Sequence, residues 1–199
     1  DDDSNTYTAS ITVHVGVTPL PVPLGLAACF SALTPNGAFA STGVTTFVGD
    51  IGSATFAFAP AGTHIGASYL VPALAVATGD LIDAYADAEA RLAGTQLPGN
   101  ISGLTVGPGV HRNAAAVGST ASTVFTIDGQ GNPNAVFIFQ VGGALALGAN
   151  FEMVLINGAQ AKNVFWGVGS SATLGSASVF KGTILAYASI TLGTTSNLQ

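Results

Sequence analysis

Short apolar runs separated by Gly or Asn dominate the second half of the chain, from Gly103 onward. Within the runs, apolar residues recur at every second position or fill four to six successive positions, a pattern typical of β-strands. No helical periodicity occurs in this half. The pattern predicts five strands, at residues 123–127, 136–141, 151–156, 164–168 and 179–185.

One short segment recurs four times between these runs. It occupies Ala114–Gly118, Ala144–Gly148, Ser171–Gly175 and Ser189–Gly193, and the repeats begin 30, 27 and 18 residues apart. One recurring strand with two intervening strands per repeat predicts a three-sided β-helix, in which each coil stacks on the previous one. The shorter final interval predicts an irregular or skipped side.

The only strong helical pattern spans Val71–Leu92, and we expect the flanking helix to lie within residues 71–93. Pro72 stands near its start and Gly94 offers a stop. Its apolar stripe, with spacings of three and four residues, needs an apolar partner face, which residues 135–141 and 164–168 can supply. The stripe consists of Leu74, Thr78, Leu81, Tyr85, Ala88 and Leu92.

Side chains alternate across a strand, so each recurring segment divides into an inward and an outward set. The outward set is small and uncharged in every repeat, and segment 41–45 fits the same frame with Val44 inward. The inward set is apolar throughout and is expected to face the core. It comprises Ala115, Val117, Leu145, Leu147, Ala172, Leu174, Ile190 and Leu192.

The outward set predicts a flat, stiff surface that binds ice. Threonine has a restricted χ1 angle, and strands about 4.7–4.9 Å apart repeat at distances comparable to those between water molecules in ice. Water ordered on such a face beforehand lowers the entropic cost of adsorption. An alternative is that the small residues pack against the helix or a second copy. The candidate ice-binding residues are Ser41, Gly43, Thr45, Ala116, Thr120, Ala146, Asn150, Ser171, Thr173, Ser189, Thr191 and Thr195.

Composition excludes several other classes of protein. Charged residues make up only 7% of the chain and the net charge is −6, so we expect no nucleic-acid partner, which would require clustered basic residues. No apolar run approaches the roughly 20 residues of a membrane helix, so we expect no membrane partner. Cys29 is the only cysteine and the three histidines are isolated, so we expect no metal and no cofactor.

Catalysis is also not expected. Some β-helices degrade polysaccharides with several Asp, Arg or Lys residues in a groove, but after Gly103 the only carboxylates are Asp128 and Glu152, on different repeats. Asp128 begins a turn-like sequence, and we expect His111 to be at the surface or partly packed. Trp166 stands inside an apolar run and is expected in the core or against the helix.

Several longer segments resemble the microbial ice-binding protein family with a discontinuous β-helix (DUF3494). The segments are 41–46 with 49–52, 84–88, 128–140, 155–175 and 180–186. The resemblance covers residues 24–198 and implies a mainly β protein, a right-handed three-sided (discontinuous) β-helix or solenoid with one long α-helix packed alongside. The length of 199 residues suits a single domain, so we expect one over residues 1–199. The family's T-A/G-x-T/N pattern is matched by 42–45 and 120–123.

The resemblance also implies secretion to the extracellular space and adsorption to the surface of ice crystals, which gives thermal hysteresis and inhibits ice recrystallisation. We expect a monomer. The alternative function is a β-helical extracellular adhesin or glycan-binding module without catalysis. Such a module predicts exposed aromatic residues on one face, and the outward set contains none.

The two ends of the chain depart from the family pattern. Family chains usually continue beyond Leu198 with further strands, and residues 1–23 are unlike the usual start. Segment 10–13 repeats the pattern of 189–192. We therefore hypothesise that the N-terminal extension supplies a strand that the C-terminus lacks, as in a circular permutation.

Overall fold

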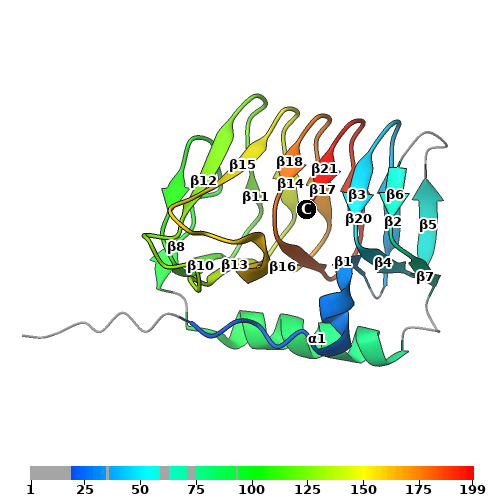
Figure 1. Ribbon diagram of the computed structural model, residues 1–199, viewed down its shortest axis with the longest axis horizontal. Helices are drawn as coiled ribbons and strands as arrows, with labels where there is room; N and C mark the ends of the chain where they lie inside the picture. Colours follow the sequence, from blue (N-terminus) through cyan, green and yellow to red (C-terminus); the bar gives the residue numbers. More distant parts are fainter. Residues whose placement is uncertain (1–18, 35, 59–62, 71–74, 93) are drawn as a thin grey trace, which may run out of the picture.

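The protein is described by a computed structural model, which covers residues 19–34, 36–58, 63–70, 75–92 and 94–199. Within these residues, three parallel β-sheets form the three sides of a solenoid, and one α-helix lies along one side (Figure 1). The prediction of a mainly β, three-sided β-helix with a helix alongside is confirmed.

Sheet I is the side that the helix covers, and it has eight strands in the order β7-β4-β1-β19-β16-β13-β10-β8. These strands are β1 (Phe30–Leu33), β4 (Asp50–Ser53), β7 (Ser68–Leu70), β8 (Thr95–Gln96), β10 (Gly109–Asn113), β13 (Phe137–Val141), β16 (Val164–Val168) and β19 (Thr183–Ala186).

Sheet II carries the recurring segments, and sheet III closes the triangle. Sheet II has the order β11-β14-β17-β20-β2-β5 and sheet III the order β6-β3-β21-β18-β15-β12-β9. The strands of sheet II are β2 (Ala38–Ser41), β5 (Thr55–Phe58), β11 (Val117–Gly118), β14 (Leu145–Leu147), β17 (Ala172–Leu174) and β20 (Ile190–Leu192). Those of sheet III are β3 (Thr46–Val48), β6 (Thr63–Ile65), β9 (Thr105–Val106), β12 (Val124–Asp128), β15 (Glu152–Ile156), β18 (Val179–Phe180) and β21 (Asn197–Leu198).

The order of coils in space differs from their order in the sequence. The C-terminal coil (β19, β20, β21) pairs on one side with β16, β17 and β18, and on the other with the N-terminal strands β1, β2 and β3. The C-terminus therefore lies in the middle of the solenoid (Figure 1). Residues 30–48 occupy the place beside the C-terminal strands, while residues 10–13 of the strand hypothesis lie outside the described residues.

Helix α1 (Ala75–Ala90) connects the two ends of this discontinuous solenoid, from β7 at one end to β8 at the other (Figure 1). Its 16 residues span about 24 Å at 1.5 Å per residue. The eight strands of sheet I extend over about 34 Å at a spacing near 4.8 Å. The helix thus covers most of the length of sheet I.

The inner face of α1 is built from alanine and leucine. The buried residues Ala77, Leu81, Ala84 and Ala88 pack in one cluster with residues of β10, β13, β16 and β19. The predicted apolar partner face at 135–141 and 164–168 is therefore confirmed. The predicted stripe is wrong at Leu92, which is 94% exposed because the helix ends at Ala90. Leu74 lies outside the described residues.

The interior of the solenoid is filled by apolar side chains from all three sheets. The predicted inward set is buried except Ala115, which is exposed because β11 begins only at Val117. Trp166 is in the core, as predicted, and its ring stacks on Phe139 with centroids 4.0 Å apart. His111 is only 4% exposed and stacks on the other face of Phe139, with ring centroids 5.2 Å apart. The expectation that His111 lies at the surface or is partly packed is therefore wrong.

The last interval between repeats has all three sides, so the expected skipped side is wrong. The single strand predicted at 179–185 is two strands, β18 and β19, joined through Lys181 and Gly182. Gly182 has a φ of +119°, and a Cβ there would lie 2.7 Å from the Val164 carbonyl oxygen. The two longer intervals between repeats, of 30 and 27 residues, are longer because they contain additional connecting segments at 129–136 and 157–163.

Candidate functional site

The outward side of sheet II is a plane of small side chains, which we call the flat face. Strand register aligns one row across all six strands, and a second row lies beside it on the same side. The first row is Gly118, Ala146, Thr173, Thr191, Ala40 and Ala57. The second is Ala144, Ser171, Ser189, Ala38 and Thr55.

The flat face is regular and stiff. Thr173 and Thr191 are direct partners on neighbouring strands, and the hydroxyl of Ser189 donates a hydrogen bond to the Ser171 hydroxyl at 2.9 Å. At about 4.8 Å per strand, six strands extend over about 24 Å. Restricted χ1 angles hold each threonine methyl and hydroxyl at a defined position.

Glycines allow the coils to approach closely at the edge of the flat face. A Cβ at Gly175 would lie 2.5 Å from the backbone of Gly148, and one at Gly193 would lie 2.7 Å from the backbone of Gly175. Any larger residue would push neighbouring coils apart. This packing requirement explains why the recurring segments end in glycine.

Turns from sheet II to sheet III border the flat face and hold the predicted residues Thr120, Asn150, Thr195 and Gly43. The hydroxyls of Thr120 and Ser102 are hydrogen-bonded at 3.0 Å. Asn150 and Thr195 occupy the same place in their turns, both with positive φ, at 54° and 59°, and the turn that holds Ala177 lies between them. Predicted residues Ala146, Thr173, Thr191, Ser171 and Ser189 lie on the flat face itself, and the exposed Ala116 directly precedes β11.

The predicted outward placement of Ser41 and Thr45 is wrong. Ser41 is 5% exposed and Thr45 is fully buried, whereas Val44, predicted inward, is 49% exposed. Ser41 pairs with the inward residue Leu192, so the predicted frame was shifted by one residue, and a one-residue shift exchanges the two faces of a strand.

Phe39 marks the correct frame for β2. It is fully buried and pairs with Ile190, which sends its neighbours Ala38 and Ala40 outward. Residues Ala38, Ala40, Thr55 and Ala57 were therefore missed by sequence reasoning. The alternation of Phe39 and Phe56 with small residues was the signal that could have found them.

The first repeat is aligned two residues away from its predicted partner. Val117 pairs with Leu145 rather than Leu147, and Gly118 pairs with Ala146. An even shift leaves each side chain on its original face. Thr120 therefore remains outside the core, but it does not align with Asn150 of the neighbouring turn.

The flat face is the uncharged side of the solenoid. Neither its strands nor the described turns at their ends contain a charged residue. Sheet III instead presents Glu152 and Asp128 among its exposed or half-buried residues, and the half-buried Lys181 directly follows its strand β18. Sheet I is covered by α1. The alternative in which the helix packs on the small-residue face is wrong, because α1 packs on sheet I.

The described residues present no group of three or more His, Cys, Asp or Glu side chains that could hold a metal ion. Asp128 forms a turn, because its Oδ1 accepts hydrogen bonds from the Gln130 amide and the Asn157 side chain, both at 2.8 Å. None of the helices within the described ranges combines the length and apolar character needed to cross a membrane.

Comparisons with known proteins agree with this architecture. An ice-binding protein from Nostoc sp. is 44% identical over 100 residues, 50% of this chain and 36% of that protein. Ice-binding protein K3-B1 of Typhula ishikariensis is 31% identical over 187 residues, 91% of this chain and 74% of that protein. The crystal structure of an ice-binding protein from the Antarctic ascomycete Antarctomyces psychrotrophicus has a TM-score of 0.76 and 31% identity, covering 90% of this chain and 98% of that one.

The chain is shorter than some of these relatives, spanning 36% of the Nostoc protein and 12% of ice-binding protein 1 of Shewanella frigidimarina. The family model described as ice-binding-like matches residues 4–199, which includes most of the N-terminal segment. With the three-sided discontinuous solenoid and its flanking helix, this match shows that the chain belongs to the ice-binding-like family.

Proposed function

We propose that this chain adsorbs to ice through the flat face and the turns that border it, giving thermal hysteresis and inhibiting ice recrystallisation. One observation carries the proposal: Thr173 and Thr191 lie side by side at the centre of an uncharged plane six strands wide. The residues proposed to contact ice are Ala38, Ala40, Gly43, Thr55, Ala57, Ala116, Gly118, Thr120, Ala144, Ala146, Asn150, Ser171, Thr173, Ser189, Thr191 and Thr195.

The physical basis is a water layer that is already partly ordered. Threonine and alanine methyl groups favour cage-like water around them, while the hydroxyls of Thr173 and Thr191 anchor that water by hydrogen bonds. A rigid face loses little conformational entropy on adsorption. Many weak contacts then add up over the plane, and ice must grow as curved fronts between adsorbed molecules, which lowers the local freezing point.

The proposal includes a secreted, monomeric protein without catalytic activity, whose partner is the ice surface. The names of the related proteins from Nostoc and Typhula support ice as the partner. The alternative of a glycan-binding module would favour aromatic side chains on the binding face, and the two rows of the flat face contain none.

The decisive experiment is the substitution Thr173→Tyr with a matched control, Thr126→Tyr. Thr126 points outward from β12 in sheet III, so both variants place the same bulky ring on a sheet surface. We expect Thr173→Tyr to lose most of the thermal hysteresis, because the ring lifts the flat face away from the lattice, and Thr126→Tyr to retain it.

Thermal hysteresis, ice recrystallisation and far-UV circular dichroism would be measured for both variants. Equal activity of Thr173→Tyr and the parent protein, with intact folds, would contradict the flat face as the binding surface. Loss of self-association rather than of ice adsorption in Thr173→Tyr would indicate that the face binds a second copy.

A further inference from the structure

The strands that precede α1 join the rest of the solenoid through one coil. Among the described residues, every β-ladder from these strands to later ones ends on the C-terminal coil, where β1 pairs with β19, β2 with β20 and β3 with β21. Strands β4, β5, β6 and β7 extend the stack outward from β1, β2 and β3. We call residues 30–34, 36–58 and 63–70 the N-terminal unit, which forms one end of the solenoid (Figure 1).

The interior of the N-terminal unit contains several polar side chains. Thr34, Ser41, Thr45 and Ser53 are each at most 5% exposed. The hydroxyls of Ser41 and Thr45 have no hydrogen-bond partner among the described residues. A buried hydroxyl without a partner loses its hydration and destabilises the fold. The N-terminal unit therefore gains less free energy from its interior than an apolar coil of the same size.

The coils of β10–β18, here called the central coils, instead bury aromatic rings that touch one another. Phe139 stacks on Trp166 with centroids 4.0 Å apart, and Trp166 packs against Phe125 at 5.9 Å and Phe180 at 5.8 Å. All four side chains are fully buried. Because buried apolar area and ring contacts supply much of the free energy that holds stacked coils together, we expect the central coils to be more stable than the N-terminal unit.

The outer end of the N-terminal unit is exposed. Strands β5, β6 and β7 are end strands of the three sheets, and the side chains of Ile65 and Leu70 are 60% and 53% exposed. At the opposite end of the solenoid, Leu97 and Ile101 are buried. A coil with a neighbour on one side only receives about half of the stacking free energy of an internal coil. The N-terminal unit is thus the less protected end.

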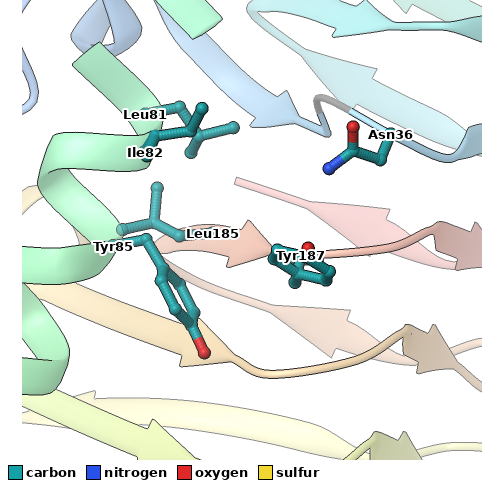
Figure 2. A pocket seen from close by; sticks show the side chains of 7 residues that line it. Asn36, Leu81, Ile82, Tyr85, Leu185 and Tyr187 are labelled. Carbon is teal, nitrogen blue, oxygen red and sulfur yellow. The ribbon is translucent and has the colours of Figure 1, made fainter. Parts of the chain in front are cut away.

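Helix α1 adds little to the junction with the N-terminal unit. Within the described ranges, Leu33 is the one buried residue of the unit in the apolar cluster beneath the helix. A groove of about 330 Å³ lies between α1 and Asn36 of the unit. Figure 2 shows the helix residues Ile82 and Tyr85 on one side of this groove, with Tyr187 and Asn36 across from them. The junction therefore depends on the C-terminal coil.

We propose that the N-terminal unit opens as one cooperative piece while the C-terminal coil and the central coils stay folded. Native proteins open in contiguous pieces whose free energies lie below that of global unfolding. In the open state the flat face loses β2 and β5 and keeps β11, β14, β17 and β20. Adsorption on all six strands would favour the closed state by mass action. This last consequence rests on the proposed function, whereas the opening itself does not.

The test is hydrogen exchange of the full chain, isotopically labelled and followed by NMR at urea concentrations below the unfolding transition. We expect the amides of β1, β2 and β4 to converge on one opening reaction. Their exchange should be about 100-fold faster than that of β13 and β16, which open only with the whole molecule. A single opening free energy shared by all five strands would overturn the proposal.

Two matched substitutions locate the boundary of the unit. Ile51→Val in β4 and Ile127→Val in β12 each remove one methyl group from a fully buried side chain. Ile51→Val should speed exchange in the N-terminal unit about fivefold. Ile127→Val should speed exchange in β13 and β16 by a similar factor and leave the N-terminal unit unchanged.

Equal acceleration of both regions by Ile127→Val would mean that the solenoid opens as a whole, which contradicts the proposal. Neither readout involves ice, so this test and the test of ice adsorption can fail separately.

Discussion

Ser41 is a polar residue enclosed at a position where the neighbouring strand β20 has a leucine. It pairs with Leu192, it is 5% exposed, and its hydroxyl has no hydrogen-bond partner among the described residues. A buried hydroxyl without a partner loses its hydration and gains nothing in return. Ser41 therefore belongs to the core and weakens it, whereas Thr173, with a similar side chain, belongs to the surface.

We predict that Ser41→Ala raises the free energy of unfolding by about 1 kcal/mol, because it removes the unpaired hydroxyl and leaves a small side chain. Urea denaturation measures the change, with thermal hysteresis expected to stay the same. The control Ser176→Ala, in an exposed turn, should change stability by less than about 0.5 kcal/mol. Destabilisation by Ser41→Ala together with reduced hysteresis would return Ser41 to the binding face.

At the scale of elements, one amide fixes the C-terminal end of α1 to sheet I, beside the apolar contacts of the helix. Gln140 of β13 is fully buried, and its Nε2 donates hydrogen bonds to the carbonyl oxygens of Ala88 at 2.6 Å, Arg91 at 2.8 Å and Glu89 at 3.2 Å. The last carbonyls of a helix have no partners within the helix. Gln140 thus caps α1 from the sheet and holds the end of the helix against the solenoid.

We predict that Gln140→Leu lowers the free energy of unfolding by about 2 kcal/mol, since it leaves buried carbonyl oxygens without donors. Denaturant unfolding followed by circular dichroism would detect the loss, and hydrogen exchange should increase at the end of α1. Gln96→Leu on the exposed strand β8 serves as control and should have little effect. Equal stability of Gln140→Leu and the parent would mean that water replaces the cap at no cost.

For the whole molecule, the pH dependence of stability is expected to come from a histidine that is buried in the solenoid. His111 donates from Nε2 to the Gly107 carbonyl at 2.9 Å and stacks on Phe139. Burial lowers its pKa from the ordinary 6.5, and the hydrogen bond to Gly107 opposes this shift. Below pH 6.5 the unfolded chain therefore binds a proton that the folded chain resists, so the folded state loses stability as the pH falls.

We predict that the free energy of unfolding decreases as the pH is lowered from 6.5, and that His111→Phe reduces this dependence while keeping the stack on Phe139. Glu89 acts in the opposite sense, because burial raises its pKa and protonation relieves a desolvated charge. Denaturation series at several pH values would compare the two proteins. Parallel curves for His111→Phe and the parent would exclude His111 as the cause.

Much of the architecture was readable from the sequence, because it depends on local patterns. Alternation in the repeats near 145, 172 and 190 distinguished core from surface, since adjacent side chains in a strand must point in opposite directions. The helix was also predicted, and so was its partner face at 135–141 and 164–168. Where alternation was ambiguous, as in segment 41–45 with Thr42 at an inward position, the predicted frame was shifted.

The sequence by itself determined three sides, one helix and a set of small uncharged residues in alternating positions. Only the tertiary structure decided that residues 30–48 stack on the C-terminal coil, that Ser41 and Thr45 point inward, and that Tyr85 and Tyr187 border one groove. The reason is physical: alternation acts between neighbours in the chain, whereas register and coil order are set by hydrogen bonds and packing between segments far apart in sequence.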